Sequence, residues 1–152
     1  MELFVRAVRL GPVLADGSKI EIADVIRKDD FRGENIRLVV DFFLKHFDEK
    51  KGVSEALLVN KLSEVLFNGI QAEKFYLAMC DKVPAEPTIE VEVDMYKKTL
   101  YEVRCKNCSR DMLKLRELIA NTDDPEKKKA LTDKSEKLDM YYHKLQQKSA
   151  AL

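Results

Sequence analysis

The order of hydrophobic and polar residues near the start of the chain predicts two short extended segments. Residues 3–8 and 19–22 alternate in twos, so that Leu3, Val5 and Ala7 fall on one side and Ile20 and Ile22 share a side later. A period of two is typical of β-strands. Ala15-Asp16-Gly17-Ser18 lies between them and has the composition of a tight turn. The pattern predicts an N-terminal β-hairpin.

From Glu34 the spacing of apolar residues changes to that of amphipathic helices. It predicts three helices, over about 34–51, 54–66 and 71–82, and each is followed by a residue that favours a stop: Gly52, Asn68-Gly69 and Pro84. The third helix is apolar around much of its circumference. Such a helix is buried in a core or covered by a partner.

Residues 88–93 alternate again, with Ile89, Val91 and Val93 on one side and Glu90 and Glu92 on the other. This pattern predicts a strand with one solvated face. A polar bend over 94–98 and a second apolar run over 99–103 would complete a second β-hairpin.

The C-terminal third predicts an antiparallel helical hairpin. Met112, Leu115 and Ile119 define a first helix, and the break before the second contains Asp124 as a cap and Pro125 at the first helical position. In the last helix, Leu131, Leu138 and Leu145 recur every seven residues and oppose the first helix. The positions of the same helix face that lie between successive leucines, taken as Lys134 and Lys148, are charged. The expected seam, the line of contact between the two helices, is therefore half apolar.

Together these elements predict an α+β fold with an N-terminal β-hairpin, a three-helix core, a second β-hairpin and a C-terminal helical hairpin. We expect one structural unit, with a compact body over 1–108 and an arm over 109–152. The length of 152 residues and the 45% of hydrophobic residues suffice for one core. The 27 basic and 27 acidic residues balance, so the chain has no global field for a polyanion.

The first ten residues contain Glu2, Arg6 and Arg9, and no apolar stretch approaches the roughly 18 residues of a membrane span. Three cysteines do not make a disulfide framework and fit a reducing compartment. We therefore expect a cytoplasmic protein without a membrane segment.

The pair Cys105 and Cys108 is the sharpest local motif. Val103-Arg104-Cys105-Lys106-Asn107-Cys108-Ser109-Arg110 resembles one knuckle of a zinc ribbon, which supplies two thiolates to a four-ligand zinc site. The resemblance implies zinc as a candidate cofactor. The remaining ligands would be Cys80 with His143 or His46, or a second knuckle across a dimer. The same pair also resembles a thioredoxin-like redox site at the start of a helix.

The order of three helices and a hairpin over 34–103 resembles a winged helix-turn-helix, which implies DNA binding through the third helix and the hairpin. This reading is the alternative function, with a C-terminal dimerisation arm. Segment 53–83 carries three basic and four acidic residues, whereas phosphate contacts need several Lys or Arg. The residues that would contact DNA are Gln71, Glu73, Lys74, Lys82, Lys97 and Lys98.

No glycine-rich phosphate loop, metalloprotease histidine pair or nucleophile-elbow serine occurs, so we predict a non-enzymatic protein. The preferred interpretation is a protein-interaction or assembly module that forms a homodimer or binds another protein through apolar helical surfaces. No resident cofactor is expected apart from the candidate zinc. The residues that would contact the partner are Phe75, Tyr76, Leu138, Tyr141 and Tyr142.

Overall fold

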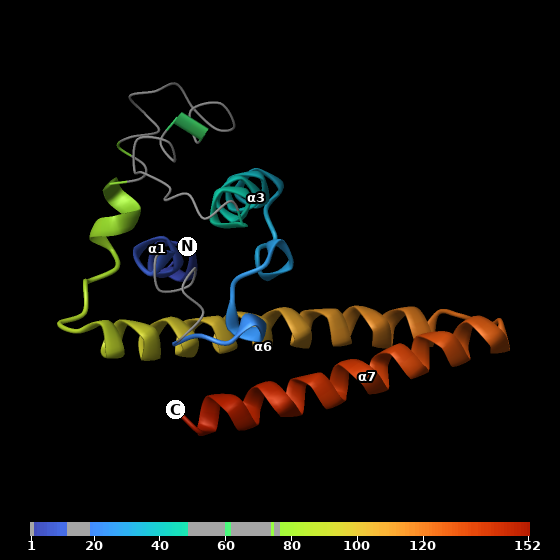
Figure 1. Ribbon diagram of the computed structural model, residues 1–152. Helices are drawn as coiled ribbons and strands as arrows, with labels where there is room; N and C mark the ends of the chain where they lie inside the picture. The colour runs from blue at the N-terminus through green and yellow to red at the C-terminus, as the bar shows by residue number, and fades with distance from the viewer. Residues whose placement is uncertain (1, 12–18, 49–59, 62–73, 75–76) are drawn as a thin grey trace. The chain divides into compact units, whose positions relative to one another are not determined.

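The fold is all-α, as the computed structural model in Figure 1 shows. The structure describes residues 2–11, 19–48, 60–61, 74 and 77–152. Of these residues, 80% are helical and none lies in a β-strand. The predicted α+β fold with two β-hairpins is therefore wrong. The predicted turn at 15–18 and nearly all of the predicted helix at 54–66 lie outside the described residues.

The chain divides into two compact units, Met1–Thr99 and Leu100–Leu152. The sequence analysis placed its boundary between residues 108 and 109. The first unit contains α1 (Glu2–Arg9), the short 3-10 helices η1 (Ile22–Asp24) and η2 (Lys28–Asp30), α3 (Glu34–Asp48) and the first turns of α6. The second unit contains the rest of α6 (Ile89–Ala120) and α7 (Pro125–Ala150).

The segment predicted as the first β-strand is α1. Its residues from Leu3 to Ala7 are all buried, on every side of the helix. The helix carries a polar stripe at helical spacing, Glu2, Arg6 and Arg9, but Arg6 within it is buried by its ion pairs, and burial runs through consecutive residues instead of every second one. The alternation over 3–8 is therefore a coincidence of composition.

The core of the first unit is built around Phe4, whose side chain is fully buried. Its ring packs edge to face against Phe31 and Phe43, with ring centres 6.3 and 6.0 Å apart. Edge-to-face geometry is favourable because the positive ring edge meets the negative ring face. Phe43 belongs to α3, and its buried neighbours Val39 and Val40 face the same core. The helix predicted from Glu34 is confirmed.

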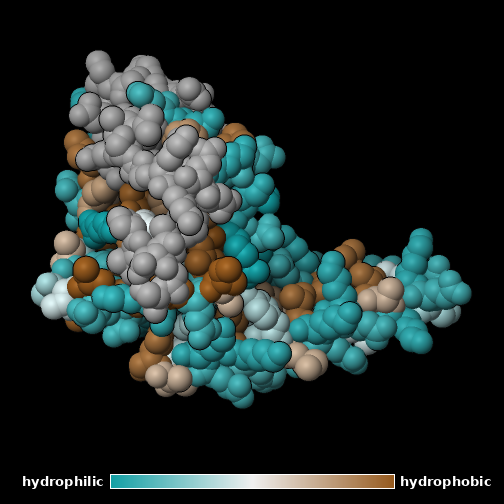
Figure 2. Space-filling model, in the orientation of Figure 1, coloured by the Kyte–Doolittle hydropathy of each residue, from teal (hydrophilic) through white to brown (hydrophobic). Residues whose placement is uncertain are grey.

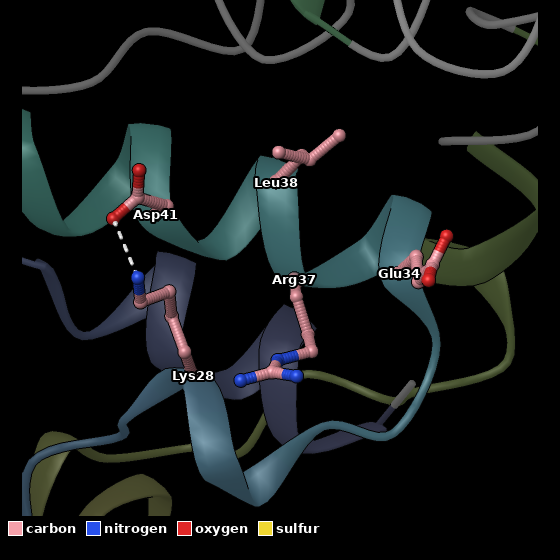
Figure 3. Close-up of a pocket in the computed structure, with 5 residues that line it drawn as sticks. All are labelled: Lys28, Glu34, Arg37, Leu38 and Asp41. Carbon is pink, nitrogen blue, oxygen red and sulfur yellow. Dashed lines mark ion pairs between the residues drawn. The ribbon is translucent and has the colours of Figure 1, made fainter.

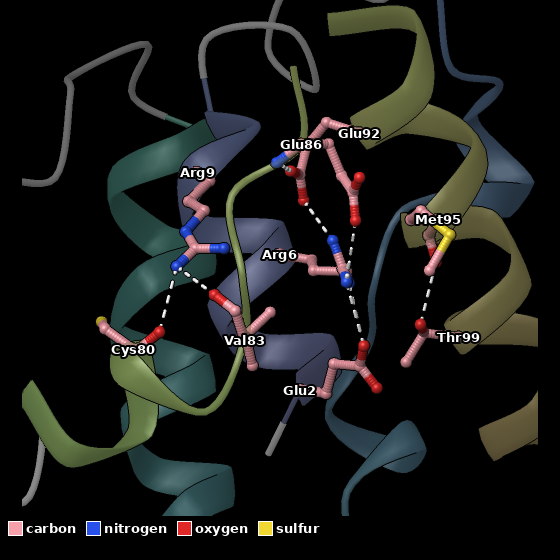
Figure 4. Close-up of polar contacts among 9 residues, drawn as sticks. All are labelled: Glu2, Arg6, Arg9, Cys80, Val83, Glu86, Glu92, Met95 and Thr99. Atoms are coloured by element: carbon pink, nitrogen blue, oxygen red, sulfur yellow. Dashed lines mark hydrogen bonds and ion pairs between the residues drawn. The ribbon is translucent and has the colours of Figure 1, made fainter. Parts of the chain in front are cut away.

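Two arginines of α1 fix the segment that leads into α6 (Figure 4). Arg6 is 1% exposed and donates from Nη1 to Oε1 of Glu92 at 2.8 Å. It also donates to Glu2 at 3.1 Å and lies 3.6 Å from Glu86. Arg9 donates from Nη2 to the carbonyl oxygens of Cys80 and Val83 at 3.2 and 2.7 Å. These contacts join residues more than seventy positions apart.

The charge of Arg6 is well supported in this buried position. Burial alone would lower the pKa of Arg6, but hydrogen bonds to Glu92 and Glu2 and the attraction of both carboxylates outweigh it, and its pKa lies above the ordinary value. A buried charge is tolerated when it is paired and hydrogen-bonded. Glu92 completes the arrangement, since its Oε2 accepts the backbone N–H of Glu86 at 3.1 Å.

Residues 89–103, predicted as the second β-hairpin, are the first four turns of α6. Thr88 caps its start by accepting the N–H of Val91 at 3.2 Å. Thr99 donates to the carbonyl of Met95, as a helical i−4 contact does. The alternation failed as a guide because burial follows the helical spacing of Val93, Tyr96 and Leu100. Glu92, predicted to face solvent, is buried against Arg6.

The second unit is an antiparallel hairpin of α6 and α7, as Figure 1 shows for the yellow-to-red part of the chain. Asp124 caps α7 by accepting the N–H of Glu126 at 3.0 Å, and Pro125 occupies the first turn, as predicted. The seam between the two helices differs from the predicted one in one respect. Its intermediate positions are not Lys134 and Lys148, which are exposed, but the half-buried residues Ser135, Tyr142 and Ser149.

Candidate functional site

The first candidate site is an open pocket of about 350 Å³ between η2 and α3 (Figure 3). Lys28 of η2 forms one wall. The other wall is one face of α3, because positions 34, 37, 38 and 41 follow the 3–4 spacing of a helix. The residues that line the pocket are Lys28, Glu34, Arg37, Leu38 and Asp41.

The charged groups of this pocket are held by long, solvent-exposed ion pairs. Asp41 lies 3.3 Å from Nζ of Lys45 and 3.6 Å from Nζ of Lys28, while Arg37 lies 3.3 Å from Asp29. The hydrogen bond from Lys45, with the positive charge of Lys28, lowers the pKa of Asp41. Exposed pairs of this kind contribute little to stability because solvent screens them, so the side chains can exchange partners readily.

The second candidate site is the surface of the α6–α7 hairpin, which contains three of the predicted partner residues. Leu138 and Tyr142 are half-buried along the seam, and Tyr141 is 37% exposed. The S–H of buried Cys108 donates to the carbonyl oxygen of Leu138 over 3.4 Å, which places α6 directly against α7 at this level. Phe75 and Tyr76 lie outside the described residues.

The hairpin covers few of its own apolar side chains between residues 109 and 140. The structure describes all eight large apolar residues in this stretch, and it buries only Leu115. Two helices bury only the narrow seam between them. Figure 2 accordingly shows hydrophobic residues among the hydrophilic ones over α6 and α7. The half-buried residues are Met112, Ile119, Leu131 and Leu138, and the exposed ones are Leu113, Leu118 and Met140.

Cys105 and Cys108 lie inside α6, one helical turn apart. They do not follow a strand or form a turn, so the local geometry on which the zinc-knuckle and thioredoxin-like resemblances rested is absent. Among the described residues, no group of three or more His, Cys, Asp or Glu is arranged to hold a metal ion. Of the other candidate ligands, His143 is exposed and lies 3.7 Å from Asp139. Zinc binding stays a prediction.

Burial raises the pKa of both thiols, and for Cys108 the neighbouring charge of Asp111 adds to this effect. A thiolate is the form that attacks disulfides and binds metals. We therefore expect Cys108 to react with Ellman's reagent about tenfold or more slowly in the folded chain than in denaturant, and Cys105 to react faster than Cys108. Equal rates for Cys108 in the folded and unfolded chain would contradict its buried position.

The structure describes four of the six residues predicted to contact DNA, and it changes the element that carries two of them. Lys97 and Lys98 lie within α6, so no hairpin of the described residues can serve as a wing. Lys74 and Lys82 are exposed, at a helical position and at a turn. Gln71 and Glu73 lie outside the described residues. The predicted hairpin that would touch the DNA backbone in a winged helix is part of a helix instead.

The sequence analysis missed the pocket at α3 and the buried Arg6. The pocket had a detectable signal, since charged residues at positions 34, 37, 41 and 45 recur at helical spacing around Leu38. Arg6 had only the local signal of its pairing with Glu2 at four residues, because its other partners Glu86 and Glu92 lie eighty or more residues away in the sequence.

Comparisons with protein-family models, curated proteins and solved structures gave no match for this chain. Within the part of the chain that the structure describes, no helix is both long enough and apolar enough to cross a bilayer. The function must therefore be inferred from the two candidate surfaces themselves.

Proposed function

We propose that this chain is a non-catalytic assembly module that associates with a second copy of itself through the apolar surface of the α6–α7 hairpin. The observation that carries this proposal is the poor coverage of apolar side chains between residues 109 and 140. Burying such side chains contributes roughly 25 cal/mol per Å² removed from water. A second helical hairpin can cover them in the manner of a four-helix bundle.

The charge pattern of the hairpin is compatible with self-association. Residues 100–152 carry 12 basic and 9 acidic side chains; over 109–140 both signs are interleaved along the two helices apart from Lys127-Lys128-Lys129, and the charged residues in the last turns of α7 are all basic. Two copies in contact therefore do not place extended patches of like charge against each other. An apolar centre with charged residues around it is the usual anatomy of a protein interface.

The absence of a recognisable catalytic constellation in the sequence supports a binding role. Cys80, Cys105 and Cys108 form no disulfide in the structure, which supports our inference that the protein works in a reducing compartment such as the cytoplasm.

Leu113→Asp and Leu118→Asp are expected to abolish association through the hairpin and so to lower the mass of the assembly, because each places a charge in the proposed contact. Both side chains are more than half exposed, so the helix itself should remain folded. Leu138→Asp should have the same effect and should also weaken the seam. The measurement is mass by light scattering across protein concentrations, with helicity by circular dichroism as the check on folding.

The matched control is Lys134→Asp, which places the same charge on an exposed position of α7 without removing an apolar side chain. It should leave the mass unchanged. A wild-type chain that stays monomeric at every concentration would exclude the proposal, as would Leu113 and Leu118 variants that assemble like the wild type.

A further inference from the structure

The outward face of α3 carries a regular stripe of charged and apolar residues. Val39, Val40 and Phe43 point into the core on the opposite side of the helix. Four of the stripe residues line the pocket described above, and all five keep at least a third of their side chain or surface accessible. We define the α3 stripe as Glu34, Arg37, Leu38, Asp41 and Lys45.

We propose that the α3 stripe is a contact surface for the α3 stripe of a second copy of this chain, in antiparallel orientation about a two-fold axis near Leu38. The reason is that the order of charges along the stripe is complementary to itself. It reads acidic, basic, apolar, acidic, basic from Glu34 to Lys45. Reversing one copy brings each charge opposite a charge of the other sign.

The helical rise of about 1.5 Å per residue allows this match to be checked. With the axis just after Val39, Glu34 and Lys45 each lie roughly 8 Å from the axis along the helix, on opposite sides. Arg37 lies roughly 4 Å and Asp41 roughly 2 Å from it, on opposite sides, so that Arg37 and Asp41 of the second copy are offset by about one residue rise, which their side chains can span. Glu34 therefore faces Lys45 of the second copy, and Arg37 faces Asp41 of the second copy. A two-fold contact repeats each pair, giving four intermolecular ion pairs.

The groups that would form these pairs are accessible. Within the described residues Arg37 pairs with Asp29 at 3.3 Å, and 44% of its side chain is exposed. Asp41 is held by Lys28 and Lys45 at 3.6 and 3.3 Å. Because pairs so exposed are weak, exchanging them for intermolecular pairs around a desolvated centre has a low cost.

Leu38 supplies the apolar centre of the contact. It is 52% exposed in the single chain, beside the two-fold axis, where the two copies of the side chain would meet. The pocket beside it, about 350 Å³ in volume, has room for side chains of the facing helix. A small apolar centre within a charged rim is typical of a reversible contact.

This inference goes beyond the hairpin contact, because the stripe lies in the first unit of the chain and the hairpin in the second. A chain with two separate self-complementary surfaces forms assemblies larger than a dimer. The two contacts can therefore be removed one at a time, and the failure of one proposal is distinguishable from the failure of the other.

The experiment uses Arg37→Asp and Asp41→Arg in a chain that also carries Leu113→Asp and Leu118→Asp, so that the hairpin contact is absent. Each charge variant alone places like charges opposite each other across the axis, and we expect each to be monomeric. When the two variants are mixed, every pair is again of opposite sign, and we expect a mixed dimer. The double variant with both charge changes should also dimerise with itself.

Mass is measured by sedimentation, with one variant carrying a fluorescent label in the mixture, and circular dichroism confirms that each variant is folded. Self-association of either charge variant as strong as that of its parent would overturn the proposal, and so would a mixture that stays monomeric. If the full chain loses all association on changing Leu113 and Leu118, the hairpin proposal stands and the α3 proposal fails. If the wild-type chain is monomeric, both fail.

Discussion

Replacement of Arg6 by methionine is expected to lower the free energy of unfolding by about 3–5 kcal/mol, the usual cost of removing one partner of a buried ion pair. The guanidinium is 1% exposed and neutralises Glu92, whose side chain is 10% exposed. Methionine fills similar space but leaves the Glu92 carboxylate without its counter-charge. It also removes the positive charge 3.6 Å from Glu86. Chemical denaturation followed by circular dichroism measures the change.

Two further variants separate the charge effect from packing. Glu2→Gln removes the most exposed partner of Arg6, at 48% exposure, and should cost less than about 1 kcal/mol. The double change Arg6→Met with Glu92→Gln should recover part of the loss, because no unpaired charge then remains at that position. A loss under about 1 kcal/mol for Arg6→Met would show that the ion pairs of Arg6 with Glu92, Glu86 and Glu2 are not formed as described.

Lys98→Pro is the second variant with a large expected effect, a loss of about 3 kcal/mol or more. Lys98 lies in the middle of α6 with its side chain exposed, so the substitution acts on the backbone alone. Proline removes a helical hydrogen bond and its ring collides with the preceding turn. In the bend of a β-hairpin, which the sequence pattern predicted over 94–98, a proline would be tolerated.

The control for this experiment is Lys98→Ala, which should change stability by less than about 0.5 kcal/mol. Denaturation midpoints of the two variants and the wild type give the comparison. Equal stability of Lys98→Pro and Lys98→Ala would contradict a continuous α6.

The elements that could be predicted from the sequence are those whose local signals agree with one another. In α3 the apolar spacing marks a single buried face, and at the start of α7 the cap Asp124 and Pro125 both indicate the same boundary. Leu145 was placed on the seam because the seven-residue recurrence of leucine is local information. These segments needed no knowledge of distant contacts.

The elements that could not be predicted depend on partners elsewhere in the chain. In α1 the polar residues Glu2, Arg6 and Arg9 recur at helical spacing, but Arg6 is buried against Glu92, so polarity does not mark the exposed side of this helix. At the start of α6, Glu92 is buried because Arg6 neutralises it. A charged residue therefore lies on the buried side of the helix, where a sequence pattern predicts an apolar one. The sequence did contain a signal for one continuous helix, since no glycine or proline interrupts it between Thr88 and Asp124.

The candidate sites were predicted only in part. The helical hairpin and Leu138 follow from the leucine spacing, but the seam position after each leucine was taken one residue too early, at Lys134 instead of Ser135. The α3 stripe was not found because the sequence analysis of this helix considered only the spacing of its apolar residues. Their complementarity to a reversed copy becomes visible only when exposure and position are considered together.

The contacts of Arg6 and Arg9 with the segment that leads into α6 also constrain when the chain can fold during its synthesis. Arg6 reaches Glu92, 86 residues later, and Arg9 reaches the carbonyl of Val83. At roughly 5–20 residues per second, the ribosome needs about 4–17 s after Arg6 before Glu92 is added. Phe31 and Phe43 can pack on Phe4 before this point, but until Glu92 is added the buried charge of Arg6 lacks its main counter-charge. The first unit of the nascent chain therefore stays incomplete for seconds, long enough for a chaperone to bind it.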